Sequence, residues 1–334
     1  MDLETFMTEV YVFIDDWYKA EIAPQREREP EQQLSESEVL TLSVLGQWRV
    51  GVPWRSERGL VRYVQSHLRG LFPHMLGRSR FNERARRLYG VMVQLQEHLV
   101  ALGTTATAVF ERVDCVPVPA YSNGQALREK AHWLTTATRG KGGYGWFHGY
   151  HLLASVSQDG LITGWLLGAA HINDRWLLEA FLSARRGRPQ LVGPAITPGC
   201  GSVATPPVAH IGPWEAVGPA REWPFLADKG FNGRRWQWHW WDSYLAWVIT
   251  VPPQRAQDQP AWSRAEKKWL ASKRQGVETA FATLQRVFGL ADHLAHSMFG
   301  LYARLAAKVV AYNFAILLNR RLGRPQGSIE TLIA

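Results

Sequence analysis

The chain has 334 residues, a length that allows one large domain or two ordinary ones, and its formal net charge is +9. This basic balance favours a polyanionic partner, of which nucleic acid is the commonest. Two cysteines, Cys115 and Cys200, exclude a disulfide framework and suit a reducing cytosol.

No targeting or membrane segment is expected. Residues 1–6 lack the basic and apolar regions of a signal peptide. The longest apolar stretch, residues 301–318, is interrupted by Arg304, Lys308 and Asn313, so it predicts a buried helix and not a membrane span. We therefore expect a cytoplasmic protein.

Residues 1–105 are expected to form an all-helical domain. Amphipathic spacing predicts helices over residues 2–19 and 56–68, and Ser35 with Glu38 forms a capping box that opens a third. A basic helix is expected to begin at Ser79. Its basic side chains either rest on DNA phosphates or form an ordinary solvated face, and the candidates are Arg80, Arg84 and Arg87.

From residue 106 the pattern changes to strands alternating with helices. Strands are predicted over residues 107–116, 147–157, 161–170, 223–227 and 245–251, with a hairpin turn at Gln158-Asp159-Gly160. Helices are predicted over residues 174–185, from 232, over 273–288 and over 297–321. This order predicts a mixed α/β sheet with helices on its faces.

One segment does not follow this alternation. Residues 187–219 contain seven prolines and six glycines with little periodicity, which predicts a long loop or an insertion. We therefore expect a helical region over residues 1–105, a catalytic domain over 106–322 with an insertion at about 187–219, and a tail over 323–334.

Two aspartates occupy equivalent positions, because Asp114 and Asp228 each follow an apolar strand. Ligand sites of open α/β sheets form at the carboxyl ends of strands. Each aspartate is alternatively an ordinary turn residue. With Glu278 from a packed helix they would make a cluster of three carboxylates, which requires cations, and hard oxygen ligands select Mg²⁺ or Mn²⁺.

Glu278 lies on a helix with a regular apolar stripe. The stripe predicts a buried face, and Glu278 lies at its margin, one turn after Arg274. The carboxylate is either a surface group paired with Arg274 or one member of the acidic cluster. The residues of the stripe are Val277, Ala280, Phe281, Leu284, Val287 and Phe288.

Four motifs in this order resemble those of the bacterial insertion-sequence transposases that have a DDE site on a ribonuclease H-like fold. They are Val-Asp-Cys-Val-Pro-Val at residues 113–118, Gly-Tyr-Gly-Trp-Phe-His-Gly-Tyr-His-Leu at 143–152, Ala-Asp-Lys-Gly-Phe at 227–231, and the run from Arg274 through Glu278 to Arg286. The resemblance covers residues 113–318. A single tetrapeptide is a weak signal, but four in the right order are specific.

The resemblance implies that Asp114, Asp228 and Glu278 are the catalytic acids. They would bind two Mg²⁺ ions, with Mn²⁺ able to substitute, for cleavage and strand transfer. It also implies that the N-terminal helices recognise transposon ends, that target DNA is a second partner, and that a homodimer or larger assembly forms on double-stranded DNA in the bacterial nucleoid. No membrane partner is expected.

The sequence also departs from the family's Tyr, Arg, Glu, Lys signature. Ala271 replaces the tyrosine and Gln285 the lysine, with Arg286 as the neighbouring basic residue. Arg274 and Arg286 are therefore the candidates for neutralising phosphates near the scissile bond.

Other basic and aromatic residues are secondary candidates for DNA contact. Lys229 either contacts a phosphate or is a solvated turn residue. Glycines beside Arg139 and Lys141 allow a close backbone approach to DNA or simply a flexible hairpin entry. Trp238 or Trp241 could stack on a base. Either Asn173 or Asp174 is expected to cap the helix that follows. Asp174 is therefore interpreted as a helix cap and not as a fourth acid of the cluster.

Two other function classes remain open. A transposase-derived protein could be catalytically silent and act as a DNA-binding repressor. A hydrolase of sugars would instead use a pair of carboxylates and no metal. The sequence has no Walker-type phosphate loop, no GxSxG and no HExxH motif.

Overall fold

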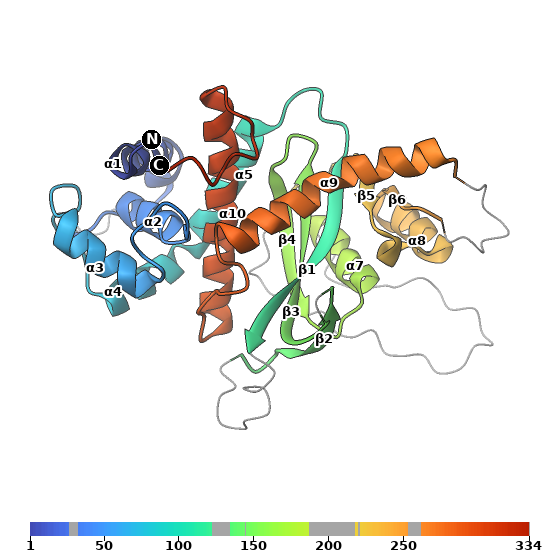
Figure 1. Ribbon diagram of the computed structural model, residues 1–334, viewed down its shortest axis with the longest axis horizontal. Helices are drawn as coiled ribbons and strands as arrows, with labels where there is room; N and C mark the ends of the chain where they lie inside the picture. Colours follow the sequence, from blue (N-terminus) through green and yellow to red (C-terminus); the bar gives the residue numbers. More distant parts are fainter. Residues whose placement is uncertain are drawn as a thin grey trace. The chain divides into compact units, whose positions relative to one another are not determined.

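The computed structural model describes residues 1–26, 33–121, 134–143, 145–186, 218–219, 221–252 and 262–333. The chain divides into two compact units (Figure 1). The helical unit contains Met1–Gly103 and Ala282–Ala334, and the α/β unit contains Thr104–Phe281. The C-terminal residues thus belong with the N-terminal helices, whereas the sequence grouped residues 106–322 together. Most of the expected insertion at 187–219 lies outside the described residues.

Four helices of the helical unit begin at residues whose side chains satisfy their first N–H groups. Ser35 and Glu38 form the predicted capping box, and Asp2, Ser56 and Ser297 cap three other helices. The helices are α1 (Leu3–Trp17), α2 (Glu36–Leu45), α3 (Glu57–His67), α4 (Arg78–Arg87), α5 (Tyr89–Gly103) and α10 (Met298–Arg321), with a π-helix (Tyr18–Ile22) and a 3-10 turn (Ala23–Gln25) after α1.

The predicted start of α4 is wrong. The helix begins at Arg78 after Gly77, so Ser79 lies inside its first turn, and no side chain caps it. A residue within the first turn has helical backbone angles and cannot take the extended conformation of an N-cap.

Helix α10 forms the centre of the helical unit, where it packs along α5 and α2. It is long and apolar enough to cross a membrane by length and composition, and 83% of its most apolar window is buried inside the protein. Such burial is that of a core helix, which agrees with the prediction from the sequence.

The α/β unit is built on a mixed sheet, as predicted, but the sheet has six strands, because residues 138–142 form a strand that was not predicted. The strands are β1 (Glu111–Tyr121), β2 (Thr138–Gly142), β3 (Gly145–Ser157), β4 (Ile162–Ala169), β5 (Phe225–Ala227) and β6 (Val248–Ile249). Their order is β2-β3-β1-β5-β6, and β4 also pairs with β3. β1 to β4 pair antiparallel, whereas β5 and β6 run parallel to β1. Gly160, with φ of 84°, closes the predicted hairpin between β3 and β4.

Strand β1 is shifted along the chain relative to the predicted 107–116. It runs from Glu111 through Pro117 to Tyr121, so Asp114 lies in its first half and not near its end. The Glu111 N–H donates to the Pro224 carbonyl, so the odd-numbered N–H groups of β1 point toward β5. The ladder with β5 ends at Val113. Pro117 therefore lies where no N–H partner is required, and the strand continues against β3.

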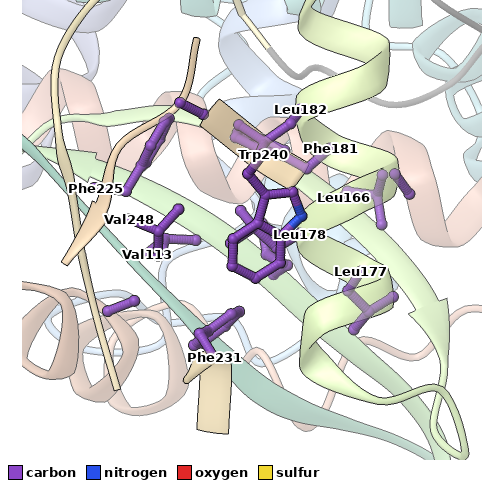
Figure 2. Close-up of a cluster of buried hydrophobic side chains, with 14 of the residues drawn as sticks. Val113, Leu166, Leu177, Leu178, Phe181, Leu182, Phe225, Phe231, Trp240 and Val248 are labelled. Atoms are coloured by element: carbon purple, nitrogen blue, oxygen red, sulfur yellow. The ribbon is translucent and has the colours of Figure 1, made fainter. Parts of the chain in front are cut away.

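Helices cover both faces of this sheet. On one face α7 (Asp174–Arg185) and α8 (Arg234–Tyr244) enclose an apolar core centred on Trp240 (Figure 2). The buried Glu179 of α7 accepts hydrogen bonds from Trp240 Nε1 at 3.0 Å and the Tyr244 hydroxyl at 2.5 Å. The other face is covered by α9 (Arg264–Arg286), through Leu270 against Phe110 and Leu226. Several of the tryptophan and tyrosine side chains are thus core.

A buried ion pair also joins the sheet to α7. Glu111 of β1 and Arg185 of α7 lie 2.6 Å apart with side-chain exposures of 0% and 2%. Burial acts to raise the pKa of Glu111, but Arg185 and the Ser155 hydroxyl outweigh it and hold that pKa below its ordinary value. Neither charge could stay buried without its partner.

We predict that Arg185→Met destabilises the protein by about 3–5 kcal/mol, because the buried Glu111 carboxylate loses its close cation and keeps only the more distant Arg221, at 4.0 Å, among the described residues. Urea denaturation followed by tryptophan fluorescence measures this difference. The control is Arg87→Met, which removes an exposed pair with Glu83 and should cost less than about 1 kcal/mol. Equal effects of the two substitutions would contradict the assignment.

Candidate active site

The sheet register brings Asp114 and Asp228 together. In the parallel ladder between β1 and β5, Val113 is paired with Ala227. Asp114 and Asp228 are the next residue on each strand, so both follow the last pair of the ladder. The two aspartates are therefore equivalent in space, although Asp114 is not at the end of its own strand.

Close packing of α9 on β1 supplies the third acid. Arg112 donates through Nε to the Lys273 carbonyl of α9 and through Nη1 to the Ser157 carbonyl at 2.5 Å. A Cβ at Gly276 would lie only 2.8 Å from the Arg112 guanidinium carbon, so the helix can approach the sheet this closely because Gly276 has no side chain. This contact positions Arg274 and Glu278 over the aspartates.

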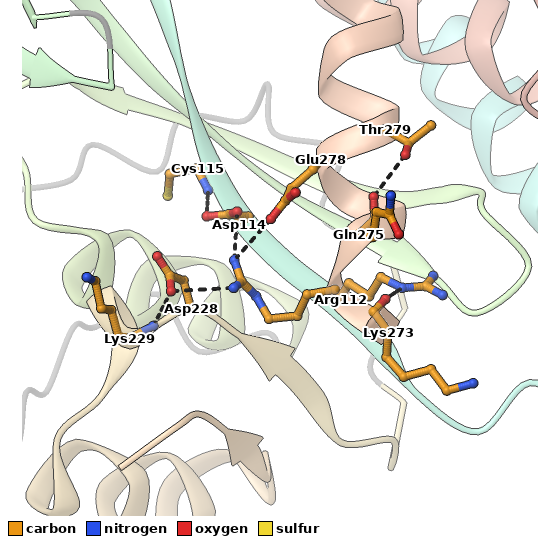
Figure 3. Close-up of polar contacts among 10 residues, drawn as sticks. Arg112, Asp114, Cys115, Asp228, Lys229, Lys273, Gln275, Glu278 and Thr279 are labelled. Atoms are coloured by element: carbon orange, nitrogen blue, oxygen red, sulfur yellow. Dashed lines mark hydrogen bonds and ion pairs between the residues drawn. The ribbon is translucent and has the colours of Figure 1, made fainter. Parts of the chain in front are cut away.

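Figure 3 shows Asp114, Asp228 and Glu278 directed toward one region. All three carboxylates form ion pairs with the guanidinium of Arg274. Arg274 lies 3.3 Å from Asp114, 3.4 Å from Asp228 and 4.0 Å from Glu278. Glu278 is thus exposed and paired with Arg274, as in the first alternative. It also shares that cation with both aspartates, as a member of the acidic cluster would.

Asp114 is the most buried of the three acids, with a side-chain exposure of 21% against 44% for Asp228 and 61% for Glu278. Burial raises the pKa of Asp114 to about 6, with Asp228 and Asp174 adding to the increase. The Cys115 N–H, 2.8 Å from Asp114 Oδ1, and the Arg274 guanidinium act in the opposite direction. A buried acid with this pKa is half protonated near pH 6.

Asp174 is a fourth acid near the site, which the sequence interpretation missed. Asn173 caps α7, and Asp174 lies in the first turn of that helix. Its carboxylate accepts a hydrogen bond from the Cys115 thiol and raises the pKa of Asp114. A Cβ at Gly230 would lie 3.1 Å from Asp174 Oδ2, so this carboxylate also touches the turn after Asp228. Its position just after the strand β4 was the available signal.

Asp114, Asp228 and Glu278 offer carboxylate oxygens around one positive charge. Oxygen atoms of this kind are the ligands that a hard divalent cation prefers. In this conformation the Arg274 guanidinium takes the place of such a cation. Within the described ranges, no three acid, histidine or cysteine side chains stand ready to hold a metal ion. Binding a metal here would therefore require Arg274 to move away from the carboxylates.

The basic candidates of the α/β unit lie in two places. Lys229 starts the 3-10 turn Lys229–Phe231, and its N–H donates to Asp228 Oδ1 at 2.5 Å. On the β2–β3 hairpin, the Arg139 guanidinium lies 4.4 Å from the ring centre of Trp146, and Lys141 pairs with Trp146 across the strands. Trp146 is 55% exposed, so this hairpin presents a cation–aromatic surface.

The basic candidates of the helical unit differ in whether their side chains are already bonded to other groups of the protein. Arg286 is paired with Glu330, and Arg87 with Glu83 at 2.6 Å. Arg84 donates to the Leu34 carbonyl at 2.5 Å and so has a structural role, while Arg80 is exposed.

The tryptophan candidates for base stacking are available at the surface. Trp238 is 59% exposed and Trp241 47% exposed, on the side of α8 away from the core. Two further tryptophans of the α/β unit, Trp247 and Trp269, are also exposed.

Comparison with protein-family models, with curated proteins and with solved structures gave no match to this chain. The function must therefore be argued from the motifs and from the geometry of the site.

We predict that Asp114 titrates with a midpoint near pH 6, measured from its carboxyl carbon by NMR and assigned with Asp114→Asn. Because the folded pKa exceeds the unfolded value of 3.8, the wild type should lose roughly 2–3 kcal/mol of stability relative to this variant between pH 4 and 6.

Above about pH 7, where Asp114 is ionised in both the folded and the unfolded protein, this difference should stay constant. Arg274→Gln should move the midpoint upward, because its guanidinium lowers the pKa of Asp114. A midpoint near pH 4 in the wild type would contradict the burial argument.

Proposed function

We propose that the protein is an insertion-sequence DNA transposase whose α/β unit is a ribonuclease H-like DDE domain. The observation that carries the proposal is the convergence of Asp114, Asp228 and Glu278 on one cation, from two adjacent strands and a helix packed across them. These three acids lie in three of the four motifs that resemble the family.

The strand arrangement supports the ribonuclease H-like assignment. An antiparallel β4-β3-β1 meander is followed in space by two strands parallel to β1. In this arrangement the first strand is central, and one acid at its middle faces a second acid after the neighbouring parallel strand. Such a sheet with helices on both faces is what the family resemblance implies.

The proposed chemistry assigns a role to each side chain. Asp114, Asp228 and Glu278 would hold two divalent ions, Mg²⁺ or Mn²⁺. When bound, these ions would activate a water or a 3′-hydroxyl as nucleophile and stabilise the leaving oxygen. Arg274, released from the carboxylates, would contact the phosphate beside the scissile bond.

The raised pKa of Asp114 has a consequence for this chemistry. Asp114 must lose its proton to act as a ligand, so the active form should increase as the pH rises through about 6. The substrates would be transposon ends and target double-stranded DNA, and joining two ends to one target calls for a homodimer or larger assembly. The exposed cation–aromatic surface at Arg139 and Trp146 suits such a partner.

The alternative is a catalytically silent relative that only binds DNA. One observation favours it: Arg274 neutralises the three acids and leaves no group of ligands ready for a metal among the described residues. The two candidates differ in whether DNA is cut, and not in whether it is bound.

We predict that the wild type cleaves DNA carrying the inverted repeats that flank its gene, with Mg²⁺ or Mn²⁺ and not with EDTA. Asp228→Asn should reduce the rate at least about 100-fold, because it removes a charged ligand, without weakening DNA binding. Gel analysis of end-labelled DNA measures cleavage, and fluorescence anisotropy measures binding.

The control for this experiment is Asp242→Asn, which removes an exposed acid of α8 and should leave cleavage unchanged. Tight binding with no cleavage by either wild type or Asp228→Asn would establish the silent relative. Activity that resists EDTA on a sugar substrate would point to the carboxylate-pair hydrolase.

We predict that DNA affinity falls steeply with salt, with a slope of about −0.9 in log–log form for each phosphate contact. The double substitution Arg139→Gln with Lys141→Gln should make the slope less negative by about two such contacts. Affinity that does not change between low and high salt would remove the nucleic-acid assignment.

A further inference from the structure

The helical unit contains a cavity of about 630 Å³, which is within the range of small-molecule sites. It is lined by the end of α2, the beginnings of α3, α5 and α10, and one side of α4, and it is partly open to solvent. Part of its wall is apolar, from Leu42, Phe81 and Met92. None of the acids of the candidate active site lines it.

The polar part of the wall has a strong excess of positive charge. Its five arginines are Arg49, Arg58, Arg78, Arg86 and Arg304. The one acid in the wall, Glu57, accepts a hydrogen bond from Asn82 at 2.7 Å and lies 3.5 Å from Arg304. Across the described part of the chain, no acid is paired with Arg58, Arg78 or Arg86.

Two of these arginines are well buried. Arg304 has a side-chain exposure of 20%, and burial lowers its pKa, with Arg86 and Arg78 adding to the decrease. Burial likewise lowers the pKa of Arg49, whose Nε is buried without a hydrogen-bond partner in the described ranges. Glu57 opposes this decrease for Arg304 and Asp292 opposes it for Arg49, so these acids compensate the two guanidinium groups only in part.

Helix α4 adds to this surplus. It has no capping side chain and no acid in its first turn, where Arg78 stands instead. A positive side chain at the positive end of a helix is unfavourable, and an anion there would satisfy free N–H groups. The spacing of the helix separates its arginines, because Arg78 and Arg86 line the cavity whereas Arg80 does not.

We propose that this cavity binds a phosphate-bearing anion of about nucleotide size. Its phosphates would contact Arg78, Arg86 and Arg304, and its less polar part would lie on Leu42 and Phe81. The same phosphate chemistry is present in a free nucleotide and in the nucleotide at the end of a DNA strand. The site is independent of the proposed transposase chemistry.

The test is calorimetric titration of the full-length protein with ATP and, separately, with inorganic pyrophosphate, both without divalent metal. The wild type should bind both. Arg78→Gln combined with Arg86→Gln should weaken binding about tenfold or more, because each removes a charge-assisted hydrogen bond. Arg321→Gln, which changes an exposed arginine in the last turn of α10 outside the cavity, should leave the affinity unchanged.

Competition with a duplex oligonucleotide identifies the source of the phosphate. If the duplex displaces ATP from the wild type, the cavity takes a DNA phosphate; if both bind together, it takes a free ligand. Absence of binding at millimolar ATP and pyrophosphate, or an equal loss in Arg321→Gln, would overturn the proposal. Circular dichroism of each variant shows whether a loss of affinity results from a loss of folded structure.

Discussion

The candidate site depends on one electrostatic constraint, which is that three carboxylates share a single guanidinium. Asp114, Asp228 and Glu278 would repel one another if no cation lay among them, and Arg274 supplies that cation within 4.0 Å of each. The same arrangement gives Arg274 two opposing effects on the site. A guanidinium that neutralises the acids also competes with any divalent ion for them, so occupancy of the site is an exchange of one cation for another.

Two features of the backbone make this convergence possible. The parallel ladder of β1 and β5 stops at Val113 and Ala227, which places the next residue of each strand side by side. Gly276 then lets α9 approach the sheet until the Arg112 guanidinium hydrogen bonds to the helix backbone. A side chain at Gly276 would meet the Arg112 guanidinium, which would then have to shift from its contact with the helix backbone. The geometry of the acids is therefore set by contacts that involve none of them.

Buried charged groups also occur elsewhere in the protein, and they differ in whether the fold supplies them with partners. The Glu111–Arg185 pair and the carboxylate of Glu179 are satisfied within the α/β unit by charged or hydrogen-bonding partners. In the helical unit, the arginines around the cavity exceed the acids that could pair with them. An internally satisfied charge stabilises a fold, whereas an uncompensated cluster marks a place for a ligand. This contrast is why the cavity and not the ion pairs carries an inference about binding.

The amino-acid sequence alone determined the local structure, because local structure follows from short-range patterns. The apolar stripe from Val277 to Phe288 is buried as its spacing predicts, and the Ser35 capping box and the Gly160 hairpin form where expected. The mixed sheet with flanking helices and a helical N-terminal region was also predictable from the order of the elements. These features need only neighbours in the chain.

Only the tertiary structure decided which distant residues meet. The continuation of β1 through Pro117 depends on the short length of β5, and the role of Asp174 depends on its contact with Cys115 across the fold. Packing likewise groups α10 with the N-terminal helices and decides which arginines of α4 line the cavity. Such contacts join residues tens to hundreds of positions apart, and no local pattern encodes the distance between them.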